Sequence, residues 1–152
     1  MSDGVPASVF GTSIALVDGD FRLVNGDLAS VSGLKNFGQA LRVIVETPFG
    51  SDQVNVNYGL DIAAIFTVAS SVRSIKDVIR LNLVKSLATD DRVREVREIV
   101  FDDEPDFAVL APEFAGADPG ATARHGRVWH AVIALTTVIG DQRQIVVSGA
   151  SP

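Results

Sequence analysis

The sequence predicts an α+β fold, with an N-terminal β-hairpin and two amphipathic helices packed on a small antiparallel or mixed sheet. Turn signals separate short β-prone runs in residues 13–28. Apolar residues recur at spacings of three and four in 32–46 and 70–91, and the C-terminal part is rich in Val, Ile and Thr. Because the chain has 152 residues, we expect a single domain over 1–152.

The N-terminal part is dominated by turn signals. Residues 1–12 are expected to form a flexible N-terminus. In "SIALVDGDFRLVN" (13–25), two β-prone segments flank Asp18-Gly19-Asp20, and Asp-Gly supplies the positive φ of a tight hairpin turn. A second turn signal follows at Asn25-Gly26-Asp27. Asp18 and Asp20 could also begin a calcium loop, but the ligands expected at later positions are missing, which favours the turn.

The segment 32–46, "SGLKNFGQALRVIVE", has the periodicity of a helix with one apolar face. Ser32 is a candidate N-cap, and Pro48 is a reason for the helix to end. The residues expected to face the core are Leu34, Phe37, Leu41, Ile44 and Val45.

The segment 70–91, "SSVRSIKDVIRLNLVKSLATDD", predicts a second amphipathic helix. Its inward residues are expected to be Val72, Ile75, Val78, Ile79, Leu83 and Leu87. Its outward residues are expected to be Arg73, Lys76, Asp77, Arg80 and Lys85. Charges on such a face are usually solvated, which is the simplest interpretation here.

Three strands are expected after the helices. "RVREVREIVFDD" predicts the first, and "RVWHAVIALTTVIGDQRQIVVSG" predicts a hairpin that turns at Gly140-Asp141. Between them, residues 102–126 are rich in acid, Pro, Gly and Ala, and they are expected to be a long acidic loop insertion.

Composition narrows the classes of partner. The net charge is −6, so nonspecific attraction to nucleic acid or to an anionic membrane is not expected. The absence of cysteine excludes disulfides and thiolate chemistry. Neither a signal peptide nor an apolar run long enough to insert in a membrane is recognisable, so we expect assembly in the cytoplasm.

The residues do not assemble a recognisable catalytic set. His125 and His130 lack the companions of a nucleophilic triad or a zinc motif. The carboxylates Asp102, Asp103, Glu104, Asp106 and Glu113 are numerous, but the chain is poor in the aromatic residues that usually line a sugar cleft. We therefore expect no enzyme activity, no cofactor and no small-molecule substrate. A carboxylate-dependent cell-wall hydrolase and a free-standing interaction adaptor stay open as alternatives.

Protein interaction is the better-supported class. A three-stranded C-terminal sheet has edges that can accept strands from another chain. Arg92, Arg94 and Arg97 lie at the start of the first of these strands, and arginine suits contacts with a partner's carboxylates. Glu95 and Glu98 are equally able to act as their counter-charges.

Four segments in order resemble one family: "LVDGDFRLVNG", "VSGLKNFGQALRVIVETPFG", "NYGLD" and "SIKDVIRLNLVKSLATDDRVREVREI". The family is the small baseplate wedge protein of contractile phage tails and of related contractile injection and type VI secretion systems, often labelled lysozyme-like. The match covers most of Ile14 to Val100.

The resemblance implies a structural protein, similar in fold to part of a tail sheath subunit. Such a protein joins the wedge core bundle around the tube and helps the first sheath ring to attach by sharing strands. The implied partners are other baseplate wedge proteins, tail sheath subunits and tube or hub proteins. The Glu-Pro-Arg triplet of the family corresponds here to Asp90-Asp91-Arg92, so that these residues, with Tyr58-Gly59 in the preceding loop, are the expected contacts.

Overall fold

The computed structural model describes residues 7–61, 63, 67, 71–114 and 128–150. The described elements are helices and small antiparallel sheets, so the α+β prediction is confirmed. The chain divides into two compact units, residues 1–41 and 42–152, and each is described by itself. The expectation of one domain over 1–152 stays a prediction. None of the described helices combines the length and the apolar character needed to cross a membrane.

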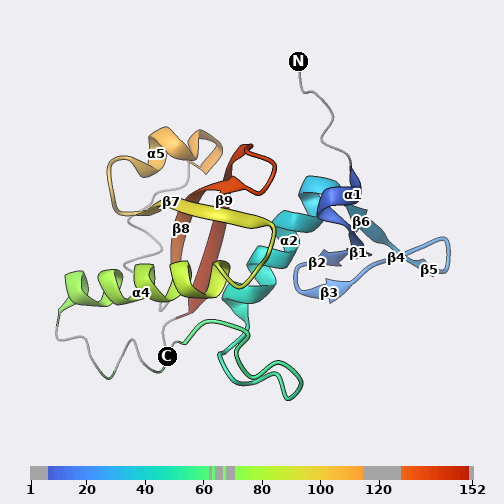
Figure 1. Cartoon of the computed structure of the whole chain (residues 1–152), viewed down its shortest axis with the longest axis horizontal. Helices are drawn as coiled ribbons and strands as arrows, with labels where there is room; N and C mark the ends of the chain where they lie inside the picture. Colours follow the sequence, from blue (N-terminus) through green and yellow to red (C-terminus); the bar gives the residue numbers. More distant parts are fainter. Residues whose placement is uncertain (1–6, 62, 64–66, 68–70, 115–127, 151–152) are drawn as a thin grey trace. The chain divides into compact units, whose positions relative to one another are not determined.

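The first unit is built from paired short strands (Figure 1). In chain order its elements are α1 (Ala7–Phe10), β1 (Thr12–Ile14), β2 (Leu16–Val17), β3 (Asp20–Phe21), β4 (Leu23–Val24), β5 (Asp27–Leu28), β6 (Ser30–Ser32) and the start of α2 (Gly33–Glu46). Strand β1 pairs with β6, while β2–β3 and β4–β5 each form an antiparallel hairpin.

Turn chemistry explains both hairpins. Asp18 and Gly19 have φ of 53° and 82°, and Asn25 and Gly26 have φ of 53° and 87°. Two successive positive φ angles are characteristic of the tight type I′ turn, which Asp-Gly and Asn-Gly favour. The predicted hairpin at Asp18-Gly19 and the second turn at Asn25-Gly26 are therefore confirmed.

The N-terminal segment differs from the expectation of a flexible 1–12. Residues 7–12 form α1 and begin β1, while 1–6 lie outside the described residues. Phe10 is buried, with its ring centroid 5.1 Å from that of Phe37. Asn36 Nδ2 donates a hydrogen bond of 2.8 Å to the Phe10 carbonyl oxygen. An aromatic contact and a buried polar contact thus order this segment. No local sequence pattern predicted these two contacts.

Helix α2 largely follows its predicted periodicity. Phe37, Leu41, Ile44 and Val45 are buried, as expected, but Leu34 is 37% exposed, so its assignment to the core was wrong. The helix ends at Glu46, two residues before Pro48. Ser32 is the last residue of β6 and immediately precedes the helix.

The second unit contains α4 (Val72–Leu87), which Ser71 caps by accepting a hydrogen bond from the Ser74 N–H. Ile79, Leu83 and Leu87 are buried as predicted. The helix lies against a three-stranded antiparallel sheet of order β7-β8-β9. These strands are β7 (Val93–Phe101), β8 (Val128–Thr137) and β9 (Gln142–Ala150). The predicted turn between the last two is confirmed, and Gly140 within it has φ of 89°.

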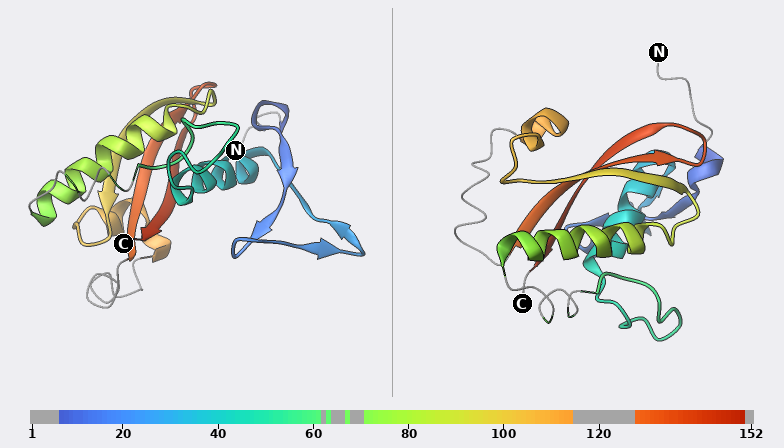
Figure 2. Two further views of the ribbon diagram at one scale, coloured as in Figure 1. Left: turned by 90° about the horizontal axis from the view of Figure 1, so that it is seen from below. Right: turned by 60° about the vertical axis from the view of Figure 1, so that its left-hand side comes forward.

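Short helices cover the other face of the sheet (Figure 2). The predicted acidic loop 102–126 contains α5 (Phe107–Leu110) and the 3-10 helix η1 (Pro112–Phe114), and 115–127 lie outside the described residues. Phe107 and Ala111 are buried in a cluster with Val100 of β7 and Val132 of β8. The start of the predicted loop is therefore part of the core, because its few apolar residues close one face of the sheet.

Candidate functional site

The loop between α2 and α4 is closed at its base by backbone hydrogen bonds. The Leu60 N–H donates to the Thr47 carbonyl oxygen at 2.8 Å, and the Phe49 N–H donates to the Leu60 carbonyl oxygen at 3.0 Å. Pro48 and Leu60 form an isolated parallel bridge. Leu60 is fully buried, so the two ends of the loop are held together where it joins the core.

Gly59 is required by this closure. Its φ is 106°, and a Cβ added there would lie 2.4 Å from the Thr47 carbonyl oxygen and 3.0 Å from the Phe49 nitrogen. The Gly59 carbonyl oxygen accepts a 2.8 Å hydrogen bond from Ser86 Oγ, a buried contact with α4. The predicted site residue Gly59 thus positions the loop against the helix.

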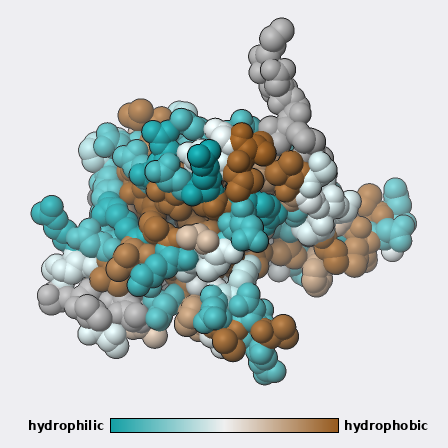
Figure 3. All heavy atoms as spheres, viewed as in Figure 1, coloured by the Kyte–Doolittle hydropathy of each residue, from teal (hydrophilic) through white to brown (hydrophobic). Residues whose placement is uncertain are grey.

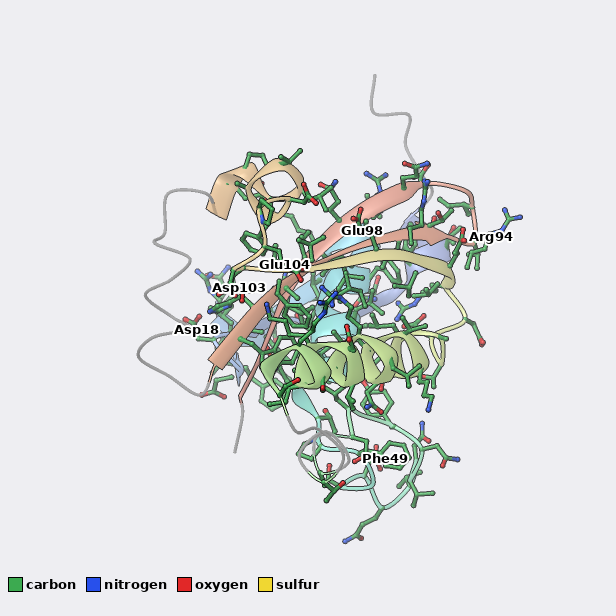
Figure 4. The ribbon with its side chains drawn as sticks, turned by 90° about the vertical axis from the view of Figure 1, so that its left-hand side faces the viewer. Asp18, Phe49, Arg94, Glu98, Asp103 and Glu104 are labelled. Atoms are coloured by element: carbon green, nitrogen blue, oxygen red, sulfur yellow. The ribbon has the colours of Figure 1, made fainter. Side chains whose placement is uncertain are left out.

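The tip of the loop is a turn that exposes apolar side chains. Asp52 Oδ1 accepts hydrogen bonds from the Val54 N–H at 2.8 Å and the Asn55 N–H at 3.1 Å. Val54 is 97% exposed, and Phe49 and Val56 are also exposed. Figure 4 labels Phe49 on this loop, which projects away from α4 and the sheet. The loop therefore offers a partner an apolar surface.

The triplet after α4 holds an internal ion pair. Arg92 Nε donates to Asp90 Oδ1 at 2.8 Å, and Arg92 Nη2 donates to Asp90 Oδ2 at 2.6 Å. The Arg92 backbone N–H also donates to Asp90 Oδ1, at 2.9 Å. Burial disfavours the charged form of Asp90, but the hydrogen bonds from Arg92 outweigh it and lower the pKa of this carboxyl. Within the chain, the guanidinium therefore fixes the turn into β7.

The charges of the Asp90–Arg92 ion pair act on the Tyr58 hydroxyl. Burial raises the pKa of the Tyr58 hydroxyl, and the charges of Asp90 and Asp52 raise it further. The pKa of Arg92 is raised by its hydrogen bond to Asp90, despite burial, with further contributions from the charges of Asp90 and Tyr58. The structure therefore brings Tyr58, Gly59, Asp90 and Arg92, from two separate segments, into one region of the second unit.

The other predicted site residues do not take part in those contacts. Asp91 is exposed in the turn, and Arg94 and Arg97 are exposed on β7 beside Glu95 and Glu98. Figure 4 labels Arg94 and Glu98 along this strand.

The two outer strands of the sheet, β7 and β9, differ in how well they could pair with a strand from another chain. The pairing of β7 with β8 shifts register between Val93 and Glu95 and again between Val96 and Glu98. Bulges and charged residues are the means by which edge strands avoid pairing with other chains. In contrast, β9 pairs with β8 without a register shift, and it carries a single charged residue, Arg143. In the part of the chain that the structure describes, no strand pairs with the other side of β9.

The acidic residues after β7 are engaged by α4. Asp103 pairs with Lys76, and Glu104 Oε1 accepts from Arg80 Nη2 at 2.5 Å. Burial disfavours the charged form of Glu104, but hydrogen bonds from Arg80 and from the Phe101 N–H lower its pKa. Figure 4 labels both carboxylates beyond the end of β7. A general acid requires a raised pKa, so Glu104 is poorly suited to glycoside hydrolysis.

Sequence reasoning missed the charged hollow that these pairs create. Its volume is about 450 Å³, and it is lined by Arg73, Lys76, Asp77, Arg80 and Glu104. Lys76 Nζ and the Arg80 guanidinium carbon lie 5.5 and 5.0 Å from the centroid of the Phe101 ring. The four-residue spacing of Lys76 and Arg80 placed them on one helix face, but Asp103 and Glu104, the acidic partners that follow β7, are distant in sequence.

Of the two histidines, only His130 lies within the described residues. Its charge opposes the rise that burial causes in the pKa of Asp102. His125 lies outside the described residues. Within the described ranges, no group of three or more His, Cys, Asp or Glu residues could hold a metal ion.

Comparisons with protein-family models, with curated proteins and with solved structures found no match for this chain. The resemblance to baseplate wedge proteins therefore stays a prediction.

Proposed function

We propose that this chain is a non-enzymatic structural component of a contractile tail or injection particle. In this role it joins the baseplate wedge around the tube and accepts a strand from a tail sheath subunit. The regular side of β9 that no described strand pairs with carries the proposal, because main-chain hydrogen bonds along such an edge can bind a strand from another chain.

The features of β7 and β9 favour β9 as the strand-accepting edge. Register shifts interrupt β7, and four of its exposed residues are charged: Arg94, Glu95, Arg97 and Glu98. Strand β9 is nine residues long and includes the sequence Ile145-Val146-Val147. A sheath strand would therefore meet fewer charges and a backbone without register shifts along β9.

The loop of Tyr58-Gly59 and the turn of Asp90-Arg92 support a second contact, with wedge proteins. Both segments belong to the family resemblance, and the charges of Asp90 and Arg92 act on the Tyr58 hydroxyl. The guanidinium of Arg92 already binds Asp90 at two points. The exposed apolar side chains of Phe49, Val54 and Val56 are therefore better placed than Arg92 to contact a partner directly.

The test places a lysine on the proposed edge. Gln144→Lys changes an exposed residue of β9, and an edge lysine disfavours strand addition. The chain would be co-expressed with the sheath, tube and wedge proteins of its candidate particle, and sheathed particles would be counted by electron microscopy. We expect about a tenfold loss of sheathed particles with no change in melting temperature, since about 1.4 kcal/mol of lost contact suffices for this factor.

The matched control is Val109→Lys, which adds the same charge at a position of α5 that is 77% exposed. Normal sheath attachment in this control is expected. Equal numbers of sheathed particles for Gln144→Lys and wild type would contradict strand addition at β9. Cryo-electron microscopy density for the chain away from the junction of tube and sheath would overturn the baseplate role itself.

A further inference from the structure

The two hairpins of the first unit are an internal repeat. "LVDGDFR" (16–22) and "LVNGDLA" (23–29) match at four of seven positions, with a period of seven residues. In both hairpins an apolar pair faces across the strands, Leu16 with Phe21 and Leu23 with Leu28. The adjacent pairs also correspond, since Val17 faces Asp20 and Val24 faces Asp27. The same structural unit is therefore presented twice.

Most of the apolar side chains of this repeat are exposed. Phe21 is 62% exposed, Leu23 66% and Leu28 50%, and Val17 and Val24 are also exposed. In Figure 3, hydrophobic residues gather around β4 and β5. Isolated two-stranded hairpins are marginally stable in water, and large exposed apolar patches commonly mark interaction sites. A partner that covers these side chains would stabilise both hairpins.

Charge distinguishes between the possible partners. The repeat carries three exposed carboxylates, Asp18, Asp20 and Asp27, against one cation, Arg22. A second copy of the chain would bring like charges together around the apolar contact, which is unfavourable. A partner with apolar residues flanked by Lys or Arg would complement both features.

The strands themselves limit how a partner binds. Each strand of the two hairpins has two residues, which is too short to align a long added strand. Recognition must therefore depend on side chains, and an amphipathic helix presents an apolar stripe between charged flanks. We propose that the twin hairpins, residues 16–28, dock a cationic amphipathic helix of another protein. This surface uses none of the residues of β9 or of the Asp90–Arg92 turn.

The test uses the full chain and two model peptides of about 18 residues, or five helical turns. One peptide contains Leu and Lys in an amphipathic pattern, and the other has Glu in place of Lys. Fluorescence anisotropy of the labelled peptides would measure binding. We expect the Leu/Lys peptide to bind and to weaken as salt rises, because exposed charges are screened. We expect the Leu/Glu peptide not to bind.

Variants separate this site from the overall negative charge of the chain. Phe21→Ser should weaken binding about tenfold or more, and Phe21→Leu should retain it, because leucine preserves most of the apolar contact. Asp18→Asn with Asp27→Asn should weaken binding and reduce its dependence on salt. Asparagine suits Asp18 because it tolerates the positive φ there, as Asn25 does.

The controls make equivalent changes outside the hairpins. Val109→Ser removes another exposed apolar side chain, and Asp106→Asn with Glu113→Gln removes the same number of charges. Both controls should bind like wild type, and circular dichroism should show all variants folded. The proposal is overturned if wild type binds neither peptide, if it binds both equally, or if the controls lose as much affinity as the hairpin variants. Dimerisation of wild type that Phe21→Ser abolishes would also overturn it, in favour of a second copy.

Discussion

Replacement of Gly59 by alanine tests whether the base of the exposed loop is as tightly constrained as its geometry indicates. The added Cβ would lie 2.4 Å from the Thr47 carbonyl oxygen and 3.0 Å from both the Phe49 nitrogen and the Pro48 carbonyl carbon. All three are backbone atoms, so no side-chain rotation relieves the overlap. The φ of 106° is also one that L-residues rarely adopt.

The loss of stability expected for Gly59→Ala has two contributions. Forcing alanine into a positive φ costs about 1–2 kcal/mol. Relief of the overlap requires the two strands of the loop base to separate, which breaks the hydrogen bonds between Leu60 and Thr47 and between Phe49 and Leu60. Each bond contributes about 0.5–1.5 kcal/mol. We therefore expect the free energy of unfolding to fall by about 2–5 kcal/mol.

Urea denaturation followed by far-ultraviolet circular dichroism measures this loss. The matched control is Gly140→Ala, because Gly140 has φ of 89° in the same unit but nothing lies within 4 Å of its added Cβ. The control should lose only the conformational contribution, about 1–2 kcal/mol. If Gly59→Ala were no more destabilising than Gly140→Ala, the close approach of Gly59 to Thr47 would not be a constraint on the fold.

Two further substitutions test the ionisable groups. Arg92→Lys keeps the charge but loses the two-point contact with Asp90, whose side chain is 9% exposed, so we expect a loss of about 1–2 kcal/mol in urea denaturation at neutral pH. Because the pKa of Asp90 is lowered below 3.8, this difference should shrink as pH falls below that value, and a constant difference would contradict the pairing. Asp102→Asn should raise the melting temperature near neutral pH, because burial raises the pKa of Asp102 and its charged form costs stability there. The gain should vanish in acid, where Asp102 is protonated, and an equal gain at both pH values would contradict the charge explanation.

The sequence predicted those parts of the fold that depend on local chemistry. Asp18-Gly19, Asn25-Gly26 and Gly140 identified the turns, since tight hairpins require positive φ and few residues adopt it. Helical periodicity likewise predicted the burial of Phe37 and Ile79. The same periodicity was wrong for Leu34, because the exposure of a residue at the edge of an apolar face depends on which neighbours pack there.

Tertiary contacts account for what the sequence did not predict. Phe107 and Ala111 lie four residues apart in an acidic, Pro-containing segment, so one helical turn gave no repeated apolar signal. Lys76 and Asp103 are 27 positions apart, and only the packing of α4 against β7 brings them together. The proximity of Tyr58 to Asp90 could not be derived from spacing either, and only the family resemblance had associated the two segments.

The geometry of the second unit changes which residues should contact a partner. Arg92 was expected to reach a partner's carboxylate, but its guanidinium already binds Asp90 at two points. Breaking that contact to bind another protein would leave the largely buried Asp90 carboxylate without those bonds, at a cost of the same order as the bond gained. The loop tip has no such cost, because Val54 is exposed and the base is fixed by Gly59. A rigid base also lowers the entropy lost on binding. In the proposed interface with a wedge protein, we therefore expect Arg92 to fix the turn into β7 and the apolar loop tip to supply the contact.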